Sequence, residues 1–208
     1  MDKAKIKLSA EEYSLVINEE FILTKQRIID KVYALFGELH ILYKEIVTEN
    51  VFFESSKILN NSARISKGEK YKYLPWVMLD YPNHFSGNDV FAVRSFFWWG
   101  NFFSITIHLS GRYKTLFEDT IVLHAENTLN HEWFICINED EWQHDFSENN
   151  YQPFLQIAGK HNFESELKEK KFIKMAKKMP FSNWNNANDF FTDGLKEIFR
   201  LLTSQPVK

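Results

Sequence analysis

The sequence predicts an α+β protein in which a mainly antiparallel sheet of about five to six strands is flanked by a long N-terminal helix and a C-terminal helix. Two observations support this class. Helix patterns stand at both ends of the chain, and strand patterns fill the middle. The segment 73–111 also gathers many Phe and Trp side chains around a Gly100-Asn101 turn, as expected for a β-hairpin. We expect the 208 residues to form a single globular domain, 1–208.

Composition excludes several classes of protein. Hydrophobic residues make up 44% and charged residues 25%, which is an ordinary globular mixture. The net charge of −3 argues against a globally basic nucleic-acid binder, so no nucleic-acid partner is expected. The chain has neither a signal-peptide pattern nor an apolar run long enough to span a membrane, and it has one cysteine, Cys136. We expect a cytoplasmic protein without a membrane partner, and we read Cys136 as a small buried hydrophobe.

The helices are predicted first. Ser9 and Glu12 have the spacing of a capping box that opens a short helix. A long helix is expected over 18–48 and a last one over 186–202, because apolar residues recur in both at steps of three and four. Both apolar stripes should pack on the sheet, which would bury Leu39 and Phe199.

The strands follow a polar connection. Residues 49–72 are expected to be irregular, with room for one short element at 51–58. Strands are predicted at 74–81, 90–99 and 102–109, the last two joined by the two-residue loop Gly100-Asn101. Further strands are expected at 120–124 and 133–138. Residues 151–157 are another candidate strand, and 164–170 a candidate helical turn before 172–179.

A two-residue loop would fix the register of the hairpin. Trp99 would then lie opposite Phe102, and the two faces would follow from the alternation of side chains. The predicted core face consists of Ala92, Arg94, Phe96, Trp98, Phe103, Ile105, Ile107 and Leu109. The other face, which mixes aromatics with hydroxyls, consists of Val93, Ser95, Phe97, Trp99, Phe102, Ser104, Thr106 and His108.

No motif identifies a catalytic site or a cofactor. The dinucleotide, P-loop, zincin and nucleophile-elbow patterns are absent, so no cofactor and no metal are assigned. An acidic segment with nearby histidines could gather metal ligands or form a solvated loop: Glu139, Asp140, Glu141, Asp145 and Glu148, with His124, His131 and His144. A lysine cluster over 168–178 could bind an anion, or it could protect an edge strand from association.

Arg94 is the one charged residue in the predicted core face. An unpaired buried guanidinium would be very costly, so it needs a partner, and Asp80 on the preceding strand is the nearest candidate in the sequence. We favour a structural ion pair. The alternative is that Arg94 grips the carboxylate or phosphate of a ligand.

The chain also resembles a group of bacterial hypothetical proteins. The resemblance lies in an LP-aromatic-VMLDYP segment, here starting at Leu74, and in FWWG-x-FFS, here starting at Phe97; it extends to EEFILTKQRIIDKVYALFGEL near the start. It implies no activity. It implies a shared family signature that includes Asp80, Arg94, Trp98, Trp99 and His108.

Three hypotheses of function remain. The first is binding of a small ligand or a protein partner through the aromatic-lined face of the sheet. The second is an enzyme of unknown reaction type that uses His108 with Asp80 or Arg94. The third is a self-association module, since dense exposed aromatics would otherwise favour aggregation. The sequence is therefore also compatible with a homo-oligomer. The candidate ligand-binding residues are Asp80, Arg94, Trp99, Phe102, Thr106 and His108.

Overall fold

A computed structural model describes residues 6–50 and 62–204 and confirms the predicted α+β class. The described residues form one antiparallel sheet of seven strands in the order β1-β2-β3-β4-β7-β5-β6. The strands are β1 (Arg64–Tyr71), β2 (Leu74–Ser86), β3 (Asp89–Trp98), β4 (Phe102–Ser110), β5 (Phe134–Cys136), β6 (Tyr151–Pro153) and β7 (Phe172–Pro180). The helices are α1 (Ala10–Val16), α2 (Glu19–Thr48), α4 (Arg112–Thr128), α5 (Phe154–Ala158), α6 (Phe163–Glu169) and α7 (Ala187–Thr203), with a 3-10 segment η3 (Phe181–Asn186) before α7. The short element considered at 51–58 lies outside the described residues.

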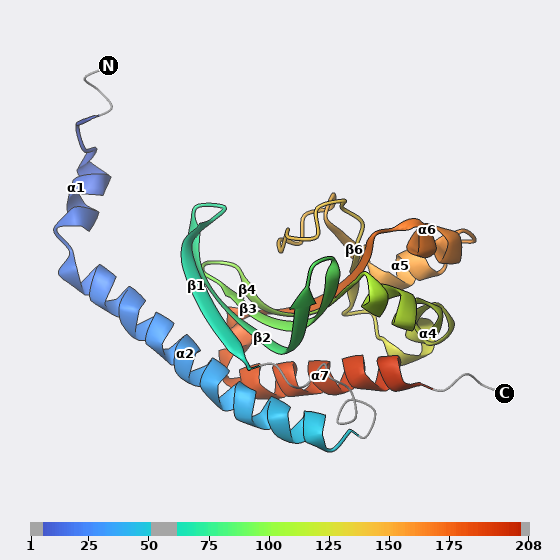
Figure 1. Cartoon of the computed structure of the whole chain (residues 1–208). Coiled ribbons are helices and arrows are strands. Elements are labelled where there is room, and N and C mark those ends of the chain that lie inside the picture. Colours follow the sequence, from blue (N-terminus) through green and yellow to red (C-terminus); the bar gives the residue numbers. More distant parts are fainter. Residues whose placement is uncertain (1–5, 51–61, 205–208) are drawn as a thin grey trace.

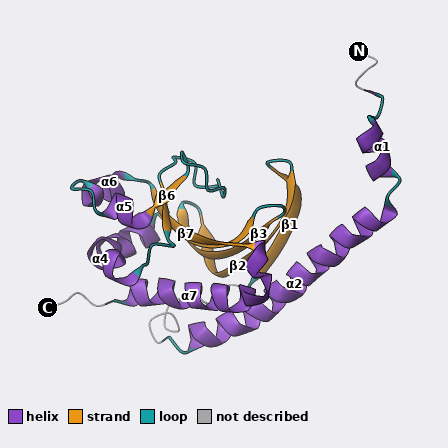
Figure 2. Ribbon diagram, turned by 180° about the vertical axis from the view of Figure 1, so that it is seen from behind, coloured by secondary structure: helices purple, strands orange, loops and turns teal. Residues whose placement is uncertain are grey.

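One face of the curved sheet is covered by helices and the other is largely free of them (Figures 1 and 2). Helix α2 packs on β2, and helix α7 packs on β4. Helix α4 contacts β3, β4 and β7. Leu39 and Phe199 are 0% and 3% exposed, so the predicted packing of both helices is confirmed. The close approach of α7 depends on Gly194, because a Cβ atom there would lie 2.8 Å from the side chain of Ile105.

The capping box at Ser9 is also confirmed. The Ser9 side chain accepts a hydrogen bond from the Glu12 amide, and the Glu12 carboxylate accepts one from the Ser9 amide. Helix α1 therefore begins where the sequence predicts, although every one of its residues is exposed.

The predicted register of the hairpin is wrong by one residue. Trp98, rather than Trp99, lies opposite Phe102, and Phe96 lies opposite Ser104. The loop has three residues, because Gly100 takes a positive φ of 72° and the Asn101 amide donates to the Trp98 carbonyl at 3.0 Å.

This shift recombines the two predicted faces. The helix-covered side combines a row of β4 with residues of β3 that were assigned to the opposite face. The β4 row consists of Phe103, Ile105, Ile107 and Leu109. Those β3 residues are Val93, Ser95 and Phe97. The open side instead combines Ala92, Arg94, Phe96 and Trp98 of β3 with Phe102, Ser104, Thr106 and His108 of β4. A single residue moved into the loop is enough to exchange sides along a whole strand.

Two strand predictions are wrong because short apolar runs do not distinguish strand from helix. Residues 120–124 lie inside helix α4, where Phe117, Ile121 and Ala125 are buried at helical spacing. The candidate strand 151–157 is divided: β6 ends at Pro153, and α5 follows it. The strand at 133–138 is confirmed as the shorter β5, and the helical turn at 164–170 is confirmed as α6.

One polar segment is a strand that was not predicted, and another is a strand whose place in the sheet was predicted wrongly. Residues 64–71, predicted to be irregular, form the edge strand β1, which lacks an apolar face because much of it meets solvent. Strand β7 lies inside the sheet between β4 and β5, so the edge-strand explanation for its lysines is wrong. Lys177 on β7 is buried and bonds to Glu197 of α7 at 3.1 Å.

Candidate functional site

The open face of the sheet is crossed by the loop between β5 and β6, residues 137–150, which we call the strap (Figure 1). Its backbone is held from β7, where the Lys174 ammonium donates to the carbonyls of Glu141 and Gln143. The far side is held by Tyr71 of β1, whose hydroxyl accepts from the amides of His144 and Asp145 at 2.6 and 3.1 Å. The strap therefore joins strands that lie far apart in the sheet.

A second contact fixes the same end of the strap. Lys72, in the turn between β1 and β2, forms an ion pair with Asp145 at 2.7 Å. The pKa of Asp145 is lowered to about 2: burial opposes this change, and the hydrogen bonds from Lys72 and Ser147 outweigh it. The acidic segment is thus an anchored strap rather than a freely solvated loop. Among the described residues, no three His, Cys, Asp or Glu side chains converge to hold a metal ion.

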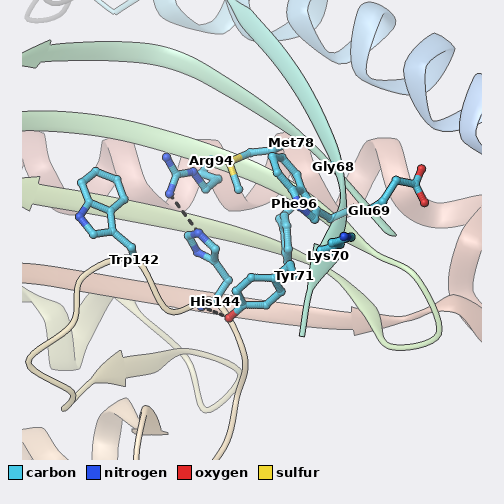
Figure 3. A pocket seen from close by; sticks show the side chains of 10 residues that line it. Gly68, Glu69, Lys70, Tyr71, Met78, Arg94, Phe96, Trp142 and His144 are labelled. Carbon is cyan, nitrogen blue, oxygen red and sulfur yellow. Dashed lines mark hydrogen bonds between the residues drawn. The ribbon is translucent and has the colours of Figure 1, made fainter. Parts of the chain in front are cut away.

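A pocket of about 670 Å³ lies between the strap and strands β1, β2 and β3 (Figure 3). Aromatic rings from all four segments surround it, and the charged groups of β1 stand at one side. Its lining consists of Gly68, Glu69, Lys70, Tyr71, Trp76, Met78, Arg94, Phe96, Trp142 and His144.

Close ring contacts make the aromatic part of the wall continuous. The ring of Tyr71 stands edge-on to Phe96 with centroids 5.9 Å apart, and the His144 ring lies 5.2 Å from Phe96. The centroid of the Trp76 ring lies 6.3 Å from that of Phe96. The wall is thus a joined set of rings with flat faces available to a ligand.

Arg94 supplies the charged group of this wall. Its Nε and Nη2 atoms donate to the two carboxylate oxygens of Asp80 at 2.7 and 3.2 Å, and both residues are 5% exposed. The predicted ion pair is therefore confirmed. The remaining nitrogen, Nη1, lies 3.5 Å from Nε2 of His144, and the Trp142 ring stands 5.8 Å from the guanidinium carbon (Figure 3). Arg94 is thus paired in the sheet and also lines the pocket.

His108 lies on the same face but is enclosed. Its Nε2 is 2.7 Å from the Glu141 carboxylate, and its ring packs against Trp142 and Phe172. Burial lowers the pKa of His108, although the bond to Glu141 opposes this change. Only 1% of His108 is exposed, and it is not part of the pocket lining.

The structure brings together five of the six predicted site residues. Asp80, Arg94 and Thr106 are successive cross-strand neighbours, and Phe102 and His108 share their face. Trp99 is the exception, because it lies in the hairpin loop and packs against the helix-side core near Phe97. Of the five, Arg94 alone lines the pocket.

The prediction missed most of the pocket wall. Tyr71 stood in a segment predicted to be irregular, and Phe96 was assigned to the core. Trp142 and His144 come from the strap, where the only signal was the histidine in the acidic segment. No local pattern in the sequence tells that this loop folds back over β3.

Acidification provides a test of the environment of His144. Burial, together with the charges of Arg94 and Lys174, holds the pKa of His144 well below its usual value. The unfolded chain binds a proton near pH 6.5 while folded His144 stays neutral. Protonation therefore favours the unfolded state, and the protein loses stability as the pH falls through about 6.5. We expect the free energy of unfolding in urea to drop from pH 7.5 to 5.5, and to drop less in His144→Gln.

The matched control is His161→Gln, which removes an exposed histidine. It should keep the pH dependence of the wild type. Equal pH dependence in the wild type and in His144→Gln would contradict the assigned environment of His144.

The fold and the site define an α+β protein with helices on one face of an antiparallel sheet and a strap-covered aromatic pocket on the other. Among the described residues, none of the helices has both the length and the apolar character needed to cross a membrane. Comparison with protein-family models, curated proteins and solved structures finds no match for this chain.

Proposed function

We propose that the protein binds a small, flat and mainly apolar ligand that carries one hydrogen-bond acceptor or anionic group. The observation that carries the proposal is the placement of the Arg94 guanidinium in the wall of an aromatic pocket. Asp80 occupies two of its nitrogens, and Nη1 faces His144 at a distance too long for a strong hydrogen bond.

The size and the lining of the pocket favour a ligand with a planar apolar body. A volume of about 670 Å³ lies within the range of ordinary small-molecule sites. Tyr71, Trp76, Phe96 and Trp142 offer ring faces and edges against which a flat group can stack.

At the Arg94 end of the pocket the local electrostatics favour an acceptor or an anion over a cation, while Glu69 and Lys70 carry opposite charges on the β1 side. The charge of Asp80 is matched by Arg94, and the buried Lys174 adds a further positive group nearby. Burial lowers the pKa of Lys174 to about 8, so it is still mostly protonated at pH 7. Burial is the main reason why the pKa of His144 lies well below its usual value, and the charges of Arg94 and Lys174 lower this pKa further.

Two probes of matched shape test the proposal. We expect 2-naphthoate to bind more tightly than the neutral 2-naphthalenemethanol in isothermal titration calorimetry at pH 7. Trp142→Ala removes one ring of the wall from a half-exposed strap position and should weaken both probes by roughly tenfold, since one stacking contact contributes about 0.5–1.5 kcal/mol beyond the area it buries.

Phe85→Ala is the control, because Phe85 is similarly exposed and lies outside the pocket lining. It should bind both probes as the wild type does. Equal affinity for the two probes would refute the anionic preference. Absence of saturable binding, or unchanged binding in Trp142→Ala, would refute the pocket as the site.

A further inference from the structure

The first part of the described chain forms an arm that extends away from the rest of the molecule. Every residue from 6 to 23 is exposed, and both views show α1 and the start of α2 projecting beyond the sheet (Figures 1 and 2). We call residues 6–23 the arm. Nine of its large apolar side chains are 45–76% exposed: Ile6, Leu8, Tyr13, Leu15, Val16, Ile17, Phe21, Ile22 and Leu23.

The nine side chains do not stand singly on the surface but follow one another along one projecting segment, and each is at least 45% exposed. Single exposed apolar residues are normal on a monomer, whereas apolar residues that gather over one surface mark an interaction site. The arm is therefore a candidate for contact with a protein partner.

The helices themselves also indicate a missing partner. Helix α1 has seven residues, and an isolated helix of that length is marginal in water. In α2 the apolar stripe that begins at Ile22 is buried from Ile29 onward by the sheet and α7. The stripe is thus continuous with the core, and only its first part lacks a cover in the described structure.

We propose that a second copy of this chain covers the arm, and that the two arms pack antiparallel about a two-fold axis. The charges are self-complementary in this arrangement. The arm carries Glu11, Glu12, Glu19 and Glu20 against one lysine, Lys7, and the next part of α2 carries Lys25, Arg27 and Lys31 against one acid, Asp30. A two-fold axis near the end of the arm sets the mainly acidic arm of each copy beside the mainly basic part of α2 in the other.

Some of these charges are still available for pairing between copies. Arg27 already bonds to Glu20 in the same helix, and Lys25 bonds to Glu69 of β1. Among the described residues, Glu11, Glu19 and Lys31 form no ion pair. These three residues can therefore form ion pairs with the second copy, and such pairs would favour the antiparallel arrangement.

The base of the arm also has space for a side chain of the partner. A cavity of about 300 Å³ lies where α2 passes β1. Ile22 and Ile29 form its apolar part, and the remaining lining consists of Lys25, Gln26, Asp30, Lys67 and Glu69. A second arm that runs antiparallel would bring its first residues, which include Lys7, Glu11 and Glu12, toward this position.

A lipid surface is a less suitable occupant. Helices that lie on membranes usually carry lysine and arginine on their polar face. The arm instead carries four glutamates and one lysine, so anionic headgroups would repel it.

The first experiment measures the oligomeric state of the full chain. We expect sedimentation equilibrium between about 1 and 100 μM to show a monomer–dimer equilibrium. The pair of changes Val16→Gln and Ile22→Gln should raise the dissociation constant at least tenfold. Ile41→Gln is the control, because it changes a 60% exposed isoleucine in the part of the same helix beyond the arm. It should leave the dimer unchanged.

The second experiment tests the antiparallel arrangement by exchanging charges. One variant carries Glu11→Lys and Glu19→Lys, and the other carries Lys31→Glu. Each alone should dissociate more readily than the wild type, and an equimolar mixture should recover the dimer as a heterodimer.

Three results would overturn the proposal. The first is a wild type that stays monomeric to 100 μM, and the second is a dimer that survives the Val16 and Ile22 changes. The third is a monomer that binds phosphatidylcholine vesicles through the arm, which would assign the surface to lipid. A mixture of charge variants that does not associate would refute the antiparallel arrangement itself. The arm lies outside the pocket lining, so the ligand proposal can succeed or fail independently.

Discussion

Arg94→Met should destabilise the protein by about 3–5 kcal/mol, because it leaves the buried carboxylate of Asp80 without its partner. Both residues are 5% exposed, and two hydrogen bonds join them between the neighbouring strands β2 and β3. The measurement is the free energy of unfolding in urea at pH 7.5. A loss below 1 kcal/mol would mean that water reaches Asp80 in the folded protein.

The double variant Asp80→Leu with Arg94→Met distinguishes the free-energy cost of one unpaired buried charge from the net contribution of the ion pair to stability. It removes both charges and should recover a substantial part of the loss, because two apolar side chains of similar size do not need the missing hydrogen bonds. If the double variant is less stable than Arg94→Met alone, then the remaining carboxylate is not the source of the destabilisation.

Phe103→Ala should also cost about 3–5 kcal/mol, since it leaves a cavity in the centre of the helix-side core. Phe103 is fully buried, and its ring contacts Phe97, Phe181, Trp184 and Phe191 at centroid distances of 5.0–5.6 Å. The measurement is again urea denaturation.

Phe102→Ala is the matched control, one residue earlier on the same strand. Phe102 points to the open face and is only partly buried, so its loss should be clearly smaller. A larger loss for Phe102→Ala than for Phe103→Ala would reverse the assignment of the two faces of β4.

The two long helices at the ends of the fold, α2 and α7, were predictable from local spacing, whereas α4 and α5 were mistaken for strands. Periodic apolar residues over 18–48 and 186–202 predicted α2 and α7 closely, because a helix covers its core with a stripe that local spacing reveals. The capping box at Ser9 was read correctly for the same reason, since its two hydrogen bonds join residues three apart.

The strands were harder to place because their partners lie elsewhere in the chain. The turn at Gly100 was predicted, but the pattern did not distinguish a two-residue loop from a three-residue loop that includes Trp99. The Asn101 amide donates to the Trp98 carbonyl at 3.0 Å, so Trp99 falls in the loop and Trp98 pairs with Phe102. The faces assigned to β3 were wrong for this reason.

The sequence by itself determined the fold class, the two packed helices, the hairpin and the pairing of Arg94 with Asp80. It could do so because helix periodicity, turn chemistry and the cost of a buried charge act on residues close in sequence or on adjacent strands. Only the tertiary structure decided which face of β3 is open and which side chains form the pocket. Tyr71 and His144 meet through a hydrogen bond between residues 73 positions apart. Such a contact depends on how the strap crosses the whole sheet, and local spacing does not encode that path.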